Sequence, residues 1–232
     1  MSTEHCHQGH RERLRERFME NGLDGFADHE VLELLLGYSI ARKDTNPLAH
    51  ELIDRYGNLQ KALDAPMEEL MNIPDMGEYS AFFVKLITDI CRRYYEQRNN
   101  KAGDTYNEDT FARYLIPRFI GRGEECLYAF YFDATKRMIK CEVLFNGTVN
   151  AVEIHVPTLV RKALKLEAAF VVLAHNHFLD ATPSLQDMKA TTCAYRALEQ
   201  NNIALLDHYI VCGNEASSMR KTGHFEKAIG LR

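Results

Sequence analysis

The sequence predicts two parts of different fold class: a helical first part, then an α/β (α+β) part with a mixed sheet and flanking helices. Residues 29–97 read as successive helices with apolar positions at helical spacing. Beyond residue 108, short β-rich runs alternate with helical segments. The polar stretch QRNNKAGDTYNED separates the two patterns and is the best candidate for a linker. We therefore predict domains at residues 1–100 and 108–232.

The first part is predicted to be a helical bundle. Residues 29–40 are a strongly apolar helix. Pro47 suits the first turn of a second helix, which Gly57 would end, and Pro66 opens another short one. Residues 78–97 carry apolar residues at helical spacing and basic residues late, where the helix macrodipole favours them.

The second part begins with two β-rich runs, CLYAFYFD and MIKCEVLF, whose separation by ATKR predicts a hairpin. Pro157 is expected to open a helix. The run AAFVVLAHNH is a buried strand, Ser184 begins a helix that reaches about Gln200, and IALLDHYIVC is the next strand. In sheets of this kind, chemistry usually lies at the strand ends.

Composition excludes several classes of protein. A chain that is 46% hydrophobic and 26% charged is neither disordered nor fibrous. No apolar run approaches the roughly 20 residues that cross a bilayer, and the charged N-terminal segment lacks the core of a secretory signal. We therefore expect a cytoplasmic protein with no membrane partner. The six cysteines form no Cys-x-x-Cys pair, and we expect most to be buried, reduced and structural.

The charge distribution disfavours nucleic acid as a partner of the helical part. Residues 1–106 carry 13 basic and 19 acidic side chains, whereas the remainder is nearly neutral. Such an acidic part repels phosphate. The arginine-rich segment HRERLRER is interleaved with Glu12 and Glu16, which favours a solvated helix face over a nucleic-acid patch.

The most informative segment is AHNHFLDATPSLQD, residues 174–187. His175 and His177 lie two apart at a strand end, so their side chains share a face, about 6.6 Å apart at Cα. That spacing lets two imidazoles converge on one metal ion. Asp187, in the first turn of the next helix, could be a third ligand that leaves a position for water, as in catalytic zinc sites. A plain helix cap at Ser184 and Asp187, and two structural histidines, are the alternative interpretations.

These segments resemble a known family. LFNGTVNAVEIHVPTLVRKAL, AAFVVLAHNH, TPSLQD and LLDHYIV are similar to the RadC family, whose C-terminal domain has the JAMM (MPN+) metalloprotease fold, a cytidine-deaminase-like architecture. GHRERLRERFMENGLDGF and EELMNIPDMG resemble that family's helix-hairpin-helix-like N-terminal region. The resemblance covers nearly the whole chain. It implies a zinc-dependent hydrolase of amide, peptide or isopeptide bonds, with an unknown peptide or protein substrate.

The resemblance also implies individual roles. The implied zinc ligands are His175, His177 and Asp187. Ser184 matches a serine that donates a hydrogen bond to the developing oxyanion. Glu125, just before CLYAFYFD, matches the general base, with Glu124 as the adjacent alternative. Imidazole and carboxylate suit Zn²⁺, and Fe or Mn are alternatives.

The chain departs from the family pattern between its second histidine and its serine. The family has seven residues there, beginning Pro-Ser-Gly, whereas this chain has six, beginning Phe178. One residue is about 3.3–3.6 Å of reach, so the shorter loop could displace Ser184 and Asp187. In that case Asp180 is the alternative carboxylate ligand.

Two further features bear on partners and on the site. The turn IPDMGEYS keeps only Gly77 of the family's Gly-x-Gly, and Asp75 and Glu78 flank it, which favours helix pairing over phosphate binding. Asp207 and His208 match another family motif and are interpreted as packing or as support that orients a ligand histidine. Two alternatives to a hydrolase stay open. One is a DNA-repair-associated accessory protein with weak DNA association, and the other is a non-catalytic metal-binding interaction module.

Overall fold

The computed structural model describes residues 4–99, 105–147 and 152–230, without the side chains of residues 4–8, 99 and 152–155. The chain divides into two compact units, residues 1–91 and 92–232, and each is described by itself. The centre of the predicted linker, residues 100–104, lies outside the described residues. Among the helices of the described ranges, none has the length and apolar character that a membrane span requires.

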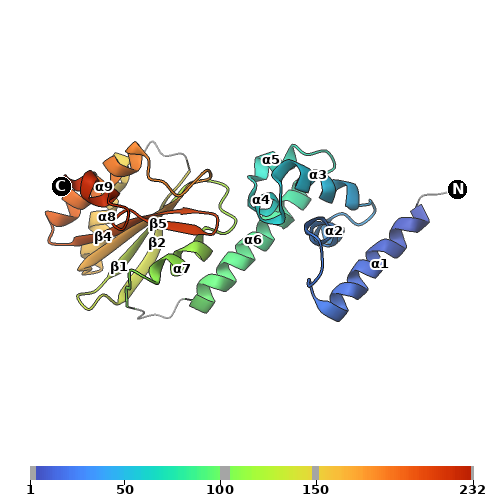
Figure 1. The fold of residues 1–232 in the computed structure, drawn as a ribbon, viewed down its shortest axis with the longest axis horizontal. Helices are drawn as coiled ribbons and strands as arrows, with labels where there is room; N and C mark the ends of the chain where they lie inside the picture. Colours follow the sequence, from blue (N-terminus) through green and yellow to red (C-terminus); the bar gives the residue numbers. More distant parts are fainter. Residues whose placement is uncertain (1–3, 100–104, 148–151, 231–232) are drawn as a thin grey trace. The chain divides into compact units, whose positions relative to one another are not determined.

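The first unit is built of helices around an apolar core, as predicted (Figure 1). Pro47 lies in the first turn of α3, and Gly57 ends that helix with a φ of 90°, a left-handed conformation that favours glycine. Pro66 immediately precedes α5. The last helix continues into the second unit. The helices are α1 (Glu4–Asn21), α2 (Asp28–Ser39), α3 (Asn46–Tyr56), α4 (Leu59–Asp64), α5 (Met67–Met71) and α6 (Glu78–Asn99).

The second unit contains a five-stranded sheet in the order β2-β1-β3-β4-β5. β3 and β4 are parallel and joined through a helix, whereas the other neighbours are antiparallel, so the sheet is mixed, as predicted. The strands are β1 (Cys126–Phe132), β2 (Met138–Asn146), β3 (Phe170–Asn176), β4 (Ala204–Cys212) and β5 (Glu215–Ser218). The helices are α7 (Phe111–Leu115), the 3₁₀ helix η1 (Ile116–Phe119), α8 (Val152–Lys165), α9 (Leu185–Glu199) and α10 (His224–Ile229).

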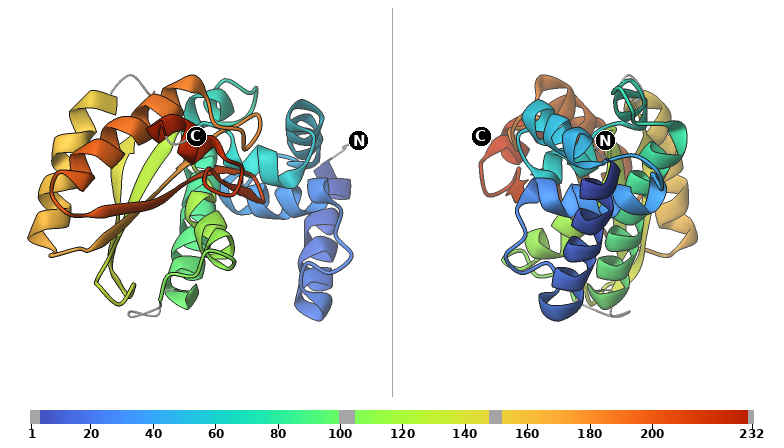
Figure 2. Two further views of the ribbon diagram at one scale, coloured as in Figure 1. Left: turned by 60° about the vertical axis from the view of Figure 1, so that its left-hand side comes forward. Right: turned by 90° about the vertical axis from the view of Figure 1, so that its right-hand side faces the viewer.

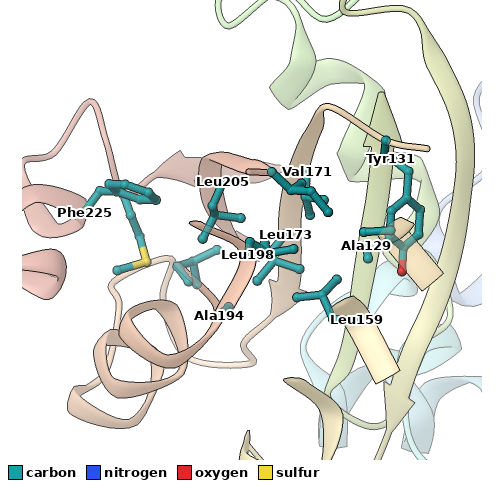
Figure 3. Close-up of a cluster of buried hydrophobic side chains, with 14 residues drawn as sticks. Ala129, Tyr131, Leu159, Val171, Leu173, Ala194, Leu198, Leu205 and Phe225 are labelled. Carbon is teal, nitrogen blue, oxygen red and sulfur yellow. The ribbon is translucent and has the colours of Figure 1, made fainter. Parts of the chain in front are cut away.

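Both faces of this sheet are covered, because successive side chains of a strand point to opposite sides. Ala129 and Tyr131 of β1 pack in the core formed with α8, α9 and α10 (Figure 3). Phe130 and Phe132 pack in a second core with α7 and η1. Figure 2 shows α8 and α9 side by side along one face. The central strands are therefore packed on both faces, which positions the residues at their ends.

The structure corrects three expectations. α8 begins at Val152 rather than at Pro157, which lies inside the helix. A proline near a helix start removes only one backbone hydrogen bond, so it does not mark the first residue. The elements α4, α7, η1, β5 and α10 were not predicted. Of the five cysteines with described side chains, only Cys126 is buried; Cys91 and Cys193 are exposed, contrary to the expectation of buried thiols.

Candidate metal centre

Three side chains that the sequence singled out lie together at the end of β3. His175 Nε2 is 2.9 Å from His177 Nε2 and 2.9 Å from Asp187 Oδ1. His177 Nε2 is 3.2 Å from Asp187 Oδ2. Donor atoms around a tetrahedral zinc ion with bonds of 2.0–2.1 Å lie about 3.3 Å apart. The set therefore has the donor types and nearly the spacing that a metal ion needs, and it is the one three-ligand cluster among the described residues.

The central strand positions the two imidazoles. His175 is in β3, paired with Leu127 of β1 and with Ile210 of β4. His177 follows the strand, and its backbone N–H donates to Val211 O at 2.8 Å. The His175 side chain is buried, and the His177 side chain is half-buried. One side of the cluster is therefore embedded in the sheet, and the other opens toward solvent.

A capping box at the start of α9 positions Asp187. The Ser184 hydroxyl accepts from Asp187 N at 3.2 Å, and Ser184 N donates to Asp187 Oδ2 at 2.6 Å. Asp187 can therefore cap α9 and serve as a metal ligand at the same time, because Oδ1 of the same carboxylate faces His175. The six-residue loop after His177 brings Asp187 to the histidines despite its shortness. The hydroxyl proton of Ser184 is not used in the cap and can be donated to another group.

The charges of the cluster support one another. Burial alone would raise the pKa of Asp187, but the two imidazoles that contact its carboxylate, those of His175 and His177, hold that pKa far below its ordinary value. The hydrogen bond to Asp187 raises the pKa of His177, and the charge of Glu125 adds to the increase. Asp187 is therefore an ionised carboxylate, the form that ligates a metal.

The alternative ligand, Asp180, has another role. Its carboxylate accepts from Thr182 N at 2.8 Å, is exposed and is not part of the three-ligand cluster. A hydrogen bond with the Asp180 backbone contributes to the raised pKa of His177. Asp180 thus contacts the site through its main chain, which helps to orient His177.

Glu125, the predicted general base, lies beside the cluster. It is half-buried directly before β1 and lines a cavity of about 60 Å³ together with His175 and Asp187. Leu173 and Ala194, both visible in Figure 3, form part of the apolar wall of the same cavity. Glu124 is exposed and does not line this cavity. An apolar wall beside a carboxylate, two imidazoles and an aspartate is typical of an enzyme pocket.

Sequence reasoning missed the function of Asn176, the residue between the two histidines. Its side chain points away from theirs, and its Oδ1 accepts from Cys126 N at 2.7 Å. Its Nδ2 donates to Glu124 O at 3.2 Å. The amide therefore holds the main chain on both sides of Glu125. Strand alternation, together with the need of a buried amide for partners, is the signal that could have revealed it.

His208, interpreted from the sequence as support, is buried in β4 next to the cluster. Its Nε2 lies 2.9 Å from His175 Nδ1, and its Nδ1 lies 2.7 Å from the hydroxyl of Thr191. Burial lowers the pKa of His208 to about 3, so its imidazole is neutral. Thr191, on the buried face of α9, is a second residue that the sequence analysis missed.

The arginines of the helical unit are partly engaged within that unit. Arg11 donates to Ile40 O at 2.9 Å and to Ala41 O at 3.0 Å, beside the end of α2. Arg17 forms a bidentate pair with Glu30 at 3.0 and 2.6 Å. Two of the four arginines in HRERLRER therefore hold α1 to the α2 region rather than forming only a solvated face.

Comparison with known proteins identifies the family of the chain. The model of the RadC-like JAB domain matches residues 105–224, and the model of the UPF0758 N-terminal region matches residues 7–82. UPF0758 protein FN0909 of Fusobacterium nucleatum is 34% identical over 229 residues, 95% of this chain and 99% of that protein. A UPF0758 protein of Stenotrophomonas maltophilia is 34% identical, covering 91% of this chain and 92% of its own. UPF0758 protein SPO0054 of Ruegeria pomeroyi is 33% identical, with coverages of 93% and 96%. The chain belongs to the UPF0758 family and carries a RadC-like JAB domain.

Proposed function

We propose that this protein is a zinc-dependent hydrolase of amide, peptide or isopeptide bonds. The observation that carries the proposal is the convergence of His175, His177 and Asp187 beside a cavity that Glu125 also lines. Two imidazoles and a carboxylate are a donor set that suits Zn²⁺ and leaves a coordination position open. When bound there, zinc supplies Lewis acidity toward water and toward a carbonyl oxygen.

The other residues have separate roles in this proposal. The Glu125 carboxylate takes a proton from the attacking water and passes it to the leaving amine. The Ser184 hydroxyl, held by the cap of α9, donates to the oxyanion that develops on the substrate. Asn176 keeps the Glu125 main chain in place through its bonds to the residues on either side. The apolar wall of the cavity limits the access of water.

The test separates metal binding from catalysis. Zinc-loaded protein is incubated with a mixed library of peptides and lysine-linked isopeptides, and new termini are counted by mass spectrometry. Glu125→Gln is expected to keep its zinc, and its rate of hydrolysis is expected to fall about 10²–10⁴-fold, since a general base contributes that much. The matched control is Glu124→Gln, one residue away, which is expected to keep both.

Two outcomes would redirect the proposal. Wild type with one zinc per chain and no more turnover than Glu125→Gln would point to a non-catalytic metal-binding module. Steeply salt-dependent binding of branched or single-stranded DNA, with no hydrolysis, would favour the DNA-associated alternative. The acidic balance of residues 1–106 leads us to expect no such binding.

A further inference from the structure

We infer that Thr191 and His208 are positioning residues that fix the tautomer of His175 and aim its Nε2 lone pair at the metal. This inference rests on the proposed metal centre and deepens it. The contacts run from α9 through β4 to β3, so three elements of the sheet unit take part. The direction of each hydrogen bond is set by which of its two atoms can carry the proton.

We call the chain of hydrogen bonds from Thr191 through His208 to His175 the relay. The hydroxyl of Thr191 sets the direction in which its hydrogen bonds are donated. Its Oγ1 lies 2.7 Å from the backbone oxygen of Asp187, one helical turn earlier. A carbonyl oxygen carries no proton. A contact as short as this one therefore requires the hydroxyl proton of Thr191 to lie between the two atoms. Met219 Sδ, 3.6 Å from the same hydroxyl, is also only an acceptor. Thr191 Oγ1 therefore accepts from Nδ1–H of His208, 2.7 Å away.

The tautomer of His208 in turn decides which atom of His175 carries a proton. His208 is 2% exposed, and its two ring nitrogens face a hydroxyl and another imidazole rather than a carboxylate. A neutral imidazole has one N–H, and Thr191 accepts it at Nδ1, so Nε2 carries the lone pair. That lone pair faces His175 Nδ1 at 2.9 Å, which must donate.

His175 is consequently held with its proton on Nδ1. Its Nε2, which lies 2.9 Å from Asp187 Oδ1, is the atom left to ligate a metal. The opposite tautomer would place a proton where the metal must bind. The relay also links the backbone of one ligand, Asp187, to the ring of another, so that the two are oriented together.

The experiment uses matched variants of the full chain and measures zinc affinity by competition with a chromophoric chelator. Thr191→Val keeps the shape but removes the acceptor, and we expect zinc affinity to fall about 10–100-fold, as for other losses of support to a ligand histidine. Thr191→Ser keeps the hydroxyl and should bind within about threefold of wild type. His208→Leu should resemble Thr191→Val. His208→Gln offers an amide oxygen to His175 Nδ1–H and should restore much of the affinity.

A second readout excludes a merely structural role. Two-bond ¹H–¹⁵N NMR correlations of the zinc-loaded protein should show the His175 proton on Nδ1. Metal-free Thr191→Val should show it shifted to Nε2, while far-UV circular dichroism reports an intact fold. Equal zinc affinity in Thr191→Val and Thr191→Ser, or a His175 proton on Nε2 in the loaded wild type, would overturn the relay and leave the hydrolase proposal standing. A well-folded wild type that binds no zinc would overturn both.

Discussion

Each unit of the molecule buries a carboxylate beside imidazole, and only one of these two carboxylates belongs to a cluster that could hold a metal ion. In the helical unit, Glu33 of α2 is 2% exposed; its Oε1 lies 3.0 Å from His10 Nε2 and its Oε2 accepts from Asn46 Nδ2 at 2.8 Å. In the sheet unit, Asp187 is 5% exposed and meets two imidazole nitrogens. Burial is thus nearly the same at the two sites.

The difference lies in the neighbouring donor atoms. An amide N–H such as that of Asn46 can donate to a carboxylate but offers no lone pair to a metal. Glu33 is therefore a structural carboxylate that joins α1, α2 and α3, with Oε2 in a hydrogen bond to Asn46 and Oε1 facing His10 without one. At the end of β3, three lone-pair donors, the Asp187 carboxylate and two imidazoles, converge beside a cavity. The type and convergence of the partners therefore distinguish a candidate metal ligand from a buried structural acid.

The largest expected effect is on metal content. His177→Ala and Asp187→Ala should each lose near-stoichiometric zinc, because two ligands do not retain the ion, whereas Glu33→Gln should keep it. Elemental mass spectrometry of the purified proteins, with protein concentration measured in parallel, gives zinc per chain. Zinc lost equally in Glu33→Gln would break the distinction between the two carboxylates.

The next largest effect is on stability, when the side-chain amide of Asn176 in the sheet unit or of Asn46 in the helical unit is removed. Asn176→Leu leaves Cys126 N–H and Glu124 O without their side-chain partner, and we expect a loss of about 3 kcal/mol in the free energy of unfolding. Asn46→Leu removes one hydrogen bond to Glu33 and should cost about 1–2 kcal/mol. Urea unfolding followed by circular dichroism measures both. A larger loss in Asn46→Leu would reverse the ranking.

A pH effect of intermediate size belongs to the sheet unit. The folded pKa of His208, about 3, lies below the ordinary value of 6.5, so the unfolded chain takes up a proton that the folded protein refuses. Stability therefore falls as pH drops through 6.5, by about 2 kcal/mol at pH 5. Metal-free wild type should lose this amount relative to His208→Gln between pH 7 and pH 5. Parallel stability curves of the two proteins would show that His208 is not buried as a neutral ring.

The smallest effect is the ion pair of the helical unit. Arg17 and Glu30 are partly exposed, so solvent screens their bidentate contact and its contribution to stability should be small. A double-mutant cycle with Arg17→Ala and Glu30→Ala, repeated at high salt, measures this coupling. A coupling that stays the same in 1 M salt would show that packing of Arg17 against Phe26, rather than charge, holds α1.

The sequence predicted the elements that have a long apolar pattern and a clear boundary residue. α3 between Pro47 and Gly57 is an example, and β3 is another. α7, η1, β5 and α10 are four to six residues long, too short for a periodic pattern. Their contacts are with other elements of the fold: α7 and η1 pack on one sheet face, β5 pairs with β4, and α10 packs against α9. Local sequence patterns therefore predicted the long helices and the central strands but not these short elements.

The same limit applies to the site. The spacing of His175 and His177 is a local property of a strand, and it pointed to a shared ion before any fold was known. Asn176 acts on residues 50 and 52 positions away, and Thr191 acts on His208 across two elements. Such roles depend on which strands become neighbours. Thr191 stands four residues after Asp187, and this helical spacing was the one local hint that they share a face.

The carboxylate of Asp187 belongs both to the start of α9 and to the cluster of imidazoles. Any ion that ties this side chain to β3 also tethers the first turn of the helix and the loop before it. Deuterium from solvent should therefore enter the Ser184 amide, which donates to Asp187 Oδ2, more slowly in loaded protein than in stripped protein. The exchange rate of that amide proton therefore reports whether the metal site is occupied, and hydrogen-exchange mass spectrometry can measure it without a known substrate.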